Sequence, residues 1–246
     1  MVEINLDGSL VDIGERMQFL RDKVLNTSQD EIAKFIGMSR SNLSSIETGR
    51  INPSLQAVLL YAYFCNVSPA WILKGIGQGP NPVKTNRRNL SVKLLDNAVF
   101  TADTIIKELP ARFKFCRENA EEKISQRKLS EMLEISQSVI SEIERGNLVP
   151  TIEYIIKFSE NLEVPIDLLL STPEQLLLMN ADSLSEHPLY GQILSSYTPK
   201  RELIKAEDII FLIQRSFSDS SELRKMAAVI ELIAKYIDQE NRGGKE

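Results

Sequence analysis

Apolar residues recur along most of the chain at intervals of three and four, while strict alternation of apolar and polar residues is rare. The first spacing puts side chains on one face of a helix, whereas alternation would indicate half-buried strands. Proline and glycine, which break helices, account for only 10 and 11 of the 246 residues. The pattern therefore predicts an all-α fold, and the length favours two or three domains.

One stretch of this pattern occurs twice. Residues 28–53 read SQDEIAKFIGMSRSNLSSIETGRINP, and residues 125–150 read SQRKLSEMLEISQSVISEIERGNLVP. The two align without a gap, and Gly49 corresponds to Gly146 at a constant shift of 97 residues. The repetition predicts two copies of one structural unit.

Each copy reads as two short helices joined by a turn. In the first copy Ser28 and Glu31 form the pattern of a capping box, which starts a helix. Gly37 follows this helix, and glycine is the residue that a tight turn with positive φ favours. Ser39 is an N-cap candidate for the second helix.

The second helix of the first copy has an unusual surface. Its only apolar residues are Leu43 and Ile46, three apart, and the remaining side chains are polar and mostly small. Two anchors are few for a core helix. A helix that enters the major groove of DNA, in contrast, needs short donors and acceptors that reach base edges.

These residues resemble the helix-turn-helix of the XRE family, the domain of lambda-repressor-like and Cro-like regulators. The resemblance extends from IGERMQFLRD (13–22) to NVSPAWILKGIGQGP (66–80), and in the second copy from ARFKFCREN (111–119) to LEVPIDLLL (162–170). It implies two five-helix, lambda-repressor-like DNA-binding domains in tandem. The expected boundaries are 11–75 and 109–172 for these domains, 76–108 for a linker with a short helix, and 173–246 for a C-terminal helical region.

The family pattern implies a set of DNA contacts in the first copy: Gln29, Ser39, Arg40, Ser41, Asn42, Ser44, Ser45 and Arg50. Arg40 is the strongest candidate reader, because arginine binds guanine O6 and N7 with two hydrogen bonds. The resemblance also implies that Gln29 holds a phosphate at a helix N-terminus and supports Arg40. Arg21 and Glu47 resemble the family's buried ion pair, which is structural.

In the second copy the corresponding contacts are Gln126, Ser136, Gln137, Ser138, Ser141 and Glu142. Gln137 can read adenine. Glu134 replaces the turn glycine, and Glu142 brings a negative charge that must pair with cytosine or be repelled by phosphate. Arg117 and Glu144 repeat the ion pair. The alternative is that this copy keeps the fold but serves as a protein-binding or dimerising module.

The two copies differ in their balance of basic and acidic residues. The net charge is −5, but residues 11–74 carry seven basic and six acidic side chains, whereas residues 111–174 carry eight and twelve. DNA binding needs a local positive potential rather than a basic chain. The balance favours the first copy as a reader of double-stranded DNA and makes the second a poorer candidate.

Other classes of function find little support. The chain has no apolar run of the roughly 20 residues needed to span a bilayer, and its start lacks the features of a signal peptide, so a cytoplasmic location is expected. Cys65 and Cys116 are expected to be buried thiols, and His187 is the only histidine. There is no phosphate-binding glycine loop. We expect no metal, no cofactor and no enzyme activity, including that of the mostly β self-cleaving peptidase domain of some phage repressors.

The arrangement suggests that a second domain replaces a second subunit. A flexible linker of about sixteen residues spans some 20–24 Å, which with the following helix can reach the next major groove about 34 Å away. The expected function is a DNA-binding transcriptional regulator that acts as a repressor. The alternative is an antitoxin-like or adaptor protein, with one domain on DNA and the other on a protein partner.

The C-terminal region is read as helices around a loop, SLSEHPLYGQ (183–192). A helix is expected to start at Pro173, and two more over 199–215 and 220–239. An apolar seam spaced 3, 4, 3, 4 runs through Leu223, Met226, Ile230, Ile233 and Ile237. This is the a/d pattern of a coiled coil, which favours a homodimer, but packing within the chain explains it equally well.

Overall fold

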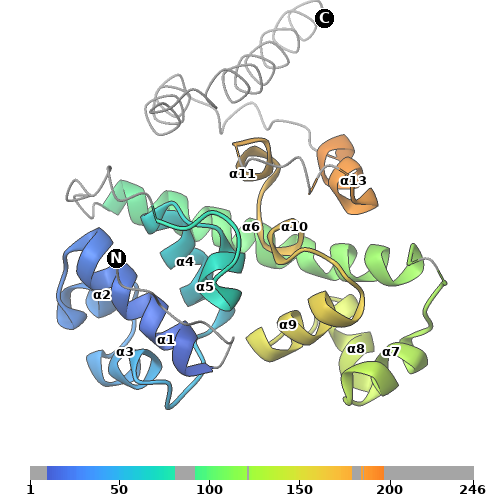
Figure 1. The fold of residues 1–246 in the computed structure, drawn as a ribbon, viewed down its shortest axis with the longest axis horizontal. Coiled ribbons are helices and arrows are strands. Elements are labelled where there is room, and N and C mark those ends of the chain that lie inside the picture. Colours follow the sequence, from blue (N-terminus) through green and yellow to red (C-terminus); the bar gives the residue numbers. More distant parts are fainter. Residues whose placement is uncertain (1–9, 81–91, 121, 179–183, 185, 197–246) are drawn as a thin grey trace, which may run out of the picture. The chain divides into compact units, whose positions relative to one another are not determined.

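The structure is a computed structural model and describes residues 10–80, 92–120, 122–178, 184 and 186–196. These residues are all-α, with helices and no strand, as the sequence predicted (Figure 1). The chain divides into two compact units, Met1–Ser171 and Thr172–Glu246. No helix of the described part is both long and apolar enough to cross a membrane.

The first half of the larger unit is a five-helix domain. Its helices are α1 (Leu10–Phe19), which continues as the π-helical η1 (Leu20–Leu25), α2 (Gln29–Phe35), α3 (Arg40–Glu47), α4 (Leu55–Cys65) and α5 (Pro69–Lys74). The four helices after η1 each begin at a serine whose hydroxyl accepts a backbone N–H of the first turn: Ser28, Ser39, Ser54 and Ser68. These caps explain why such short helices start where they do.

The second half repeats this arrangement. Its helices are α6 (Val92–Glu118), α7 (Gln126–Leu133), α8 (Gln137–Glu144), α9 (Ile152–Asn161) and α10 (Ile166–Leu170). α6 packs against α8 and α10, as α1 packs against α3 and α5. The C-terminal part of α6 is therefore the counterpart of α1.

α6 differs from the helix that the sequence predicted. We expected a short helix within the linker over 76–108 and a separate second domain from residue 109. Instead the 27-residue α6 continues through Pro110. One continuous face of it is buried, through Ala98, Ala102, Ile105, Leu109 and Phe113. This burial on both sides of Pro110 outweighs the lost backbone hydrogen bond.

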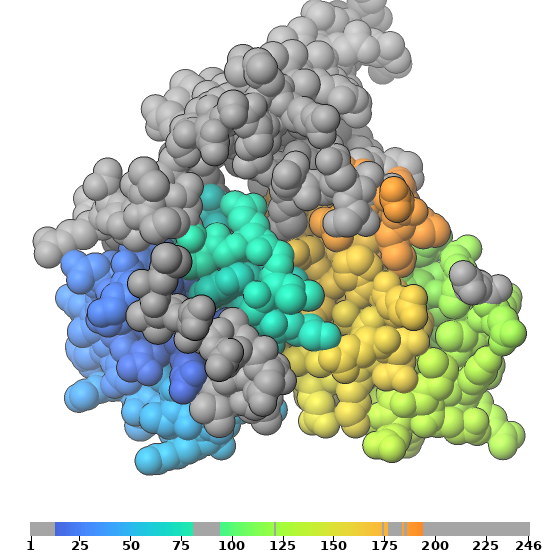
Figure 2. Space-filling model, viewed as in Figure 1, coloured from blue at the N-terminus to red at the C-terminus, as the bar shows by residue number. Residues whose placement is uncertain are grey.

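α6 also joins the two domains. It contacts α4 of the first domain, and Figure 1 shows α4 beside the N-terminal half of α6. α5 packs against α10, and in Figure 2 the surface of the first domain meets that of residues 150–170 directly. The two domains are thus packed together, which the expectation of a flexible tether did not include.

A buried arginine closes each five-helix domain. Arg16 donates to the carbonyl oxygens of Ile72 and Leu73 at 2.6 and 3.0 Å. Arg112 does the same for Leu168 and Leu169, at 3.0 and 2.8 Å. Both arginines therefore satisfy carbonyl groups at the end of the fifth helix, where no intrahelical partner exists. The sequence pattern gave no sign of this role.

The smaller unit contains α11 (Pro173–Leu178) and α13 (Pro188–Ser196). The start at Pro173 agrees with the sequence, but the loop predicted over 183–192 is wrong in its second half, which belongs to α13. Pro188 occupies the first helical position, where its missing N–H costs nothing, and Leu189 and Ile193 are buried on one face. The helices expected after residue 197 and their apolar seam lie outside the described residues.

Candidate nucleic-acid interface

The turn between α2 and α3 follows the sequence prediction. The Ser28 hydroxyl accepts the N–H of Glu31, whose carboxylate accepts the N–H of Ser28, so the capping box is complete. Gly37 adopts a φ of 75°. Its counterpart Glu134 adopts a φ of 57°, a conformation that costs a side-chain-bearing residue energy. Both copies therefore make the same turn, but the second makes it under strain.

α3 is anchored by the two apolar residues that the sequence singled out. Leu43 is fully buried and Ile46 is 2% exposed. Ser39 caps the helix by accepting the N–H of Asn42. The other predicted contact residues face outward: Arg40, Ser41, Asn42 and Arg50 are exposed, and Ser44 and Ser45 are partly exposed. The polar face of α3 is therefore not part of the hydrophobic core and remains accessible to solvent.

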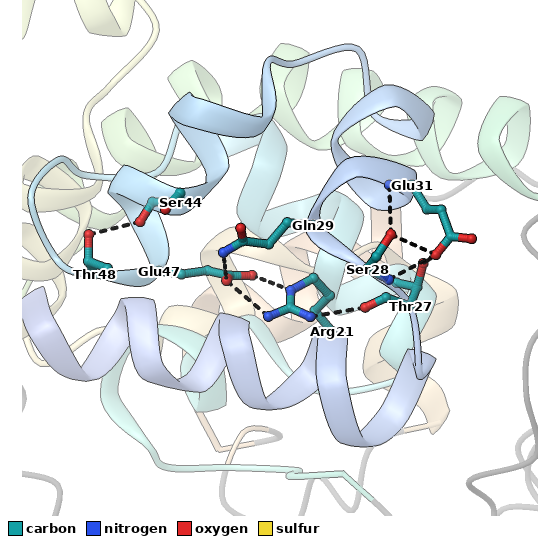
Figure 3. Close-up of polar contacts among 8 residues, drawn as sticks. All are labelled: Arg21, Thr27, Ser28, Gln29, Glu31, Ser44, Glu47 and Thr48. Carbon is teal, nitrogen blue, oxygen red and sulfur yellow. Dashed lines mark hydrogen bonds and ion pairs between the residues drawn. The ribbon is translucent and has the colours of Figure 1, made fainter.

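An ion-pair cluster ties α3 to the helices before it (Figure 3). Nε and Nη2 of Arg21 donate to the two carboxylate oxygens of Glu47 at 2.6 and 3.1 Å. Gln29 Nε2 donates to Glu47 Oε2 at 2.7 Å. The hydrogen bond to Glu47 raises the pKa of Arg21 above its ordinary value. The predicted pair is confirmed, and the side-chain amide of Gln29 belongs to it.

The second copy has the same cluster. Arg117 Nε donates to Glu144 Oε1 at 2.6 Å, and Gln126 Nε2 donates to Glu144 Oε2 at 2.8 Å. Arg117 also donates to the carbonyl oxygen of Ile124 at 2.9 Å, as Arg21 does to that of Thr27. The geometry that orients α3 therefore orients α8 as well.

The polar surfaces around α3 and α8 differ in the charges that they carry. The side chains of Arg40 and Arg50 form no ion pair with any residue that the structure describes. On α8, Glu142 accepts from Arg145 at 2.9 Å and from Asn147 at 3.0 Å. Its charge is therefore balanced by a neighbour, an outcome that the sequence reading did not include. Ser136, Gln137 and Ser138 are exposed, and Ser141 is partly exposed.

Comparison with known protein families gives the same two segments. A family model described as helix-turn-helix matches residues 20–72 and, separately, residues 114–169. The chain carries two tandem XRE-type helix-turn-helix domains. No curated protein and no solved structure matches the chain. This domain type is a DNA-binding regulatory domain, so the match indicates a DNA-binding regulator of the XRE type.

The second helix-turn-helix domain has a hollow beside the start of α7. Its volume is about 480 Å³, and its lining is Arg117, Lys123, Ile124, Ser125, Gln126, Arg127 and Gln137. Two exposed basic side chains, Lys123 and Arg127, therefore line the same hollow as two of the predicted contact residues, Gln126 and Gln137. The first domain has Asp30 where the second has Arg127.

Lys123 and Arg127 are candidate contacts that the sequence reading missed. The acidic surplus of residues 111–174 hid them, because a count over a whole domain averages out the charges around one helix start. The partner of Arg127 is exposed: Arg127 pairs with Glu131 at 3.1 Å. Such pairs contribute little in water and exchange readily for another anion. A search for basic residues near each predicted helix N-terminus would have found both.

Proposed function

We propose that this protein is a sequence-specific repressor of transcription that reads operator DNA with α3. The observation that carries the proposal is the exposed face of α3. It presents Arg40 among small polar side chains, and Arg50 follows just beyond the end of the helix. Neither arginine forms an ion pair with a residue that the structure describes, and Leu43 and Ile46 are the only apolar residues of α3. A core helix would not need this face, whereas a helix in the major groove does.

Arg40 is the base reader in this proposal, because it lies at the first position of α3 and its guanidinium can bind guanine with two hydrogen bonds. Ser41, Ser44 and Ser45 are small enough for the helix to approach base edges closely. Asn42 and Arg50 contact the phosphates on either side. Phosphate contacts position the helix, and base contacts specify the sequence.

Gln29 has a modified role in this proposal. Its side-chain amide donates to Glu47, so the side chain supports the cluster under α3. The phosphate is then held by backbone N–H groups at the start of α2 other than that of Glu31, which donates to the Ser28 hydroxyl. Gln126 has the same role in the second domain, where Lys123 and Arg127 add positive charge.

The second domain reads DNA as well, with Gln137 on adenine and Ser136, Ser138 and Ser141 around it. Arg145 balances the charge of Glu142, which lowers its repulsion from phosphate. Repression follows from occupancy alone, because a protein that covers a promoter excludes the polymerase. In the alternative, α8 faces a protein partner as in an adaptor, and substitutions on α8 leave DNA binding unchanged.

The proposal is tested with Arg40→Ala in the full chain. Loss of a bidentate base contact should weaken binding to the selected operator by about 1–3 kcal/mol and relax the preference at one base pair. Binding to random DNA should change little. Fluorescence anisotropy on both duplexes at one salt concentration measures this. Asn42→Ala is the matched control, because a lost phosphate contact should weaken both duplexes equally. An equal loss for Arg40→Ala on both duplexes would assign Arg40 to phosphate as well.

A further inference from the structure

The two helix-turn-helix domains meet through their fifth helices. The N–H of Ala70 in α5 donates a 3.0 Å hydrogen bond to Oδ1 of Asp167 in α10. The two residues are 4% and 7% exposed. In the same turn of α5, the N–H of Trp71 donates to the hydroxyl of Ser68. The cap of a helix in one domain is therefore completed by a carboxylate of the other.

Ala70 and Asp167 occupy equivalent positions in the two repeats. They are 97 residues apart, which is the shift that aligns the repeated segments. When equivalent positions touch, the same surface patch of each partner faces the other, as it does across a two-fold axis. A head-to-tail arrangement brings different patches together. The contact therefore indicates that an approximate two-fold axis relates the domains and passes close to α5 and α10.

Further contacts fix the distance between the domains. α6 packs on α4 and also provides the first helix of the second domain. Lys74 in α5 forms an ion pair with Glu160 in α9 at 2.7 Å. At Gly77, where φ is 85°, an added Cβ would lie 2.6 Å from Ser68 Oγ and 3.0 Å from Asp167 Oδ2. Only glycine fits this close approach, so the chain that leaves the first domain is held against the interface.

We propose that one chain acts as an internal dimer and binds a single DNA site made of two inverted, unequal half-sites at one fixed spacing. The inference rests on the proposed function of α3 and α8 as DNA readers. A two-fold axis makes these helices approach DNA in opposite senses, which requires inverted rather than direct repeats. Both helices lie along the lower edge of the larger unit in Figure 1. The half-sites differ because Arg40 and Gln137 are equivalent residues with different base preferences.

The test uses the full chain and three duplexes built from the two selected half-sites. The first keeps them inverted at the selected spacing, the second inserts five base pairs between them, and the third presents them as a direct repeat. The insertion turns one half-site by about half a helical turn. We expect the second and third duplexes to bind on the order of 10²-fold more weakly, as a single half-site does, because they lose the gain from linkage. Native mass spectrometry should find one chain per duplex.

Two variants assign the half-sites. Arg40→Ala should relax base preference in one half-site only, and Gln137→Ala in the other only. Tightest binding to the direct repeat, equal binding with and without the insertion, or two chains on each duplex would overturn the internal dimer while leaving sequence-specific binding intact. Failure to prefer any duplex over random DNA would overturn the proposed function and this inference together.

Discussion

At the scale of single residues, the second repeat contains a strained turn that the first avoids. Glu134 has a φ of 57°, and its side chain points into solvent with 84% of its surface exposed. Glu134→Gly should therefore raise the free energy of unfolding by about 0.5–1 kcal/mol, because glycine adopts positive φ without steric cost. Urea denaturation followed by circular dichroism measures the change.

The first repeat supplies the matched control for this turn. Gly37 has a φ of 75° and no atom within 4 Å of an added Cβ, so a substitution there changes backbone strain alone. Gly37→Glu should destabilise the protein by a similar amount. If Glu134→Gly is neutral and Gly37→Glu costs energy, then a contact of the Glu134 side chain, such as its 3.8 Å approach to Lys157, offsets the strain.

Asp167 is a second residue whose environment has a measurable consequence. Burial raises its pKa from the ordinary 3.8 to about 6. The folded protein therefore binds this proton more readily than the unfolded chain, and the group favours folding more as the pH falls from about 6 toward 4. Above about pH 6 the buried charge carries its full cost.

Asp167→Asn removes that cost but keeps the oxygen that accepts the N–H of Ala70. It should raise the free energy of unfolding at pH 7.5 by about 1–2 kcal/mol. The gain should shrink toward zero as the pH falls through 6 to about 4. Denaturation curves of both proteins at a series of pH values check this. A difference that is independent of pH would show that the carboxyl is not protonated in this range.

At the scale of elements, the ion-pair clusters set the orientation of α3 and α8. In the Arg21–Glu47 pair the side chains retain 10% and 2% of their exposed surface. Glu47→Ala leaves the guanidinium of Arg21 and the amide of Gln29 without their acceptor. We expect a loss of about 2–4 kcal/mol in the free energy of unfolding, because an unpaired buried charge is costly.

Glu144→Ala is the matched variant in the second domain, where the contacts have nearly the same lengths. It should cost a similar amount, because the same three side chains meet there. A loss below about 1 kcal/mol in either variant would mean that water reaches the arginine once its partner is gone. If only one variant shows so small a loss, the two domains differ in how firmly α3 and α8 are held.

The extent of α6 shows where element prediction from sequence reached its limit. The second domain was expected to begin at residue 109, next to Pro110, which is itself a local signal for a helix end. The buried face that runs from Ala98 to Phe113 is made of contacts with both domains. The stabilisation that this face provides depends on tertiary packing, which the spacing of apolar residues alone does not reveal. The same reason applies to Arg16 and Arg112, whose partners lie 56 residues away along the chain.

At the scale of the whole molecule, the apolar spacing predicted the all-α class, and the repeat predicted two copies of the helix-turn-helix. These predictions depend on short-range signals, namely caps, a turn glycine and the spacing of apolar anchors. Both ion pairs were expected from the family resemblance, because their partners are 26 and 27 residues apart. The packing of the two domains was not predictable from the sequence. It depends on a hydrogen bond between Ala70 and Asp167, and neither residue has a sequence feature that distinguishes it from other helix residues. The partners of Glu142, in contrast, are local: Arg145 and Asn147 lie three and five residues after it, so the sequence spacing could have indicated them.

The proposed function depends above all on sequence-specific binding of DNA by the helix-turn-helix domains. The most direct measurement selects binding sites from random duplex DNA with the full chain. It then compares the Kd for the selected duplex with that for a scrambled duplex of the same composition, at one physiological salt concentration. We expect a Kd at least about 10³-fold lower for the selected duplex. Equal Kd values for the two duplexes would contradict it.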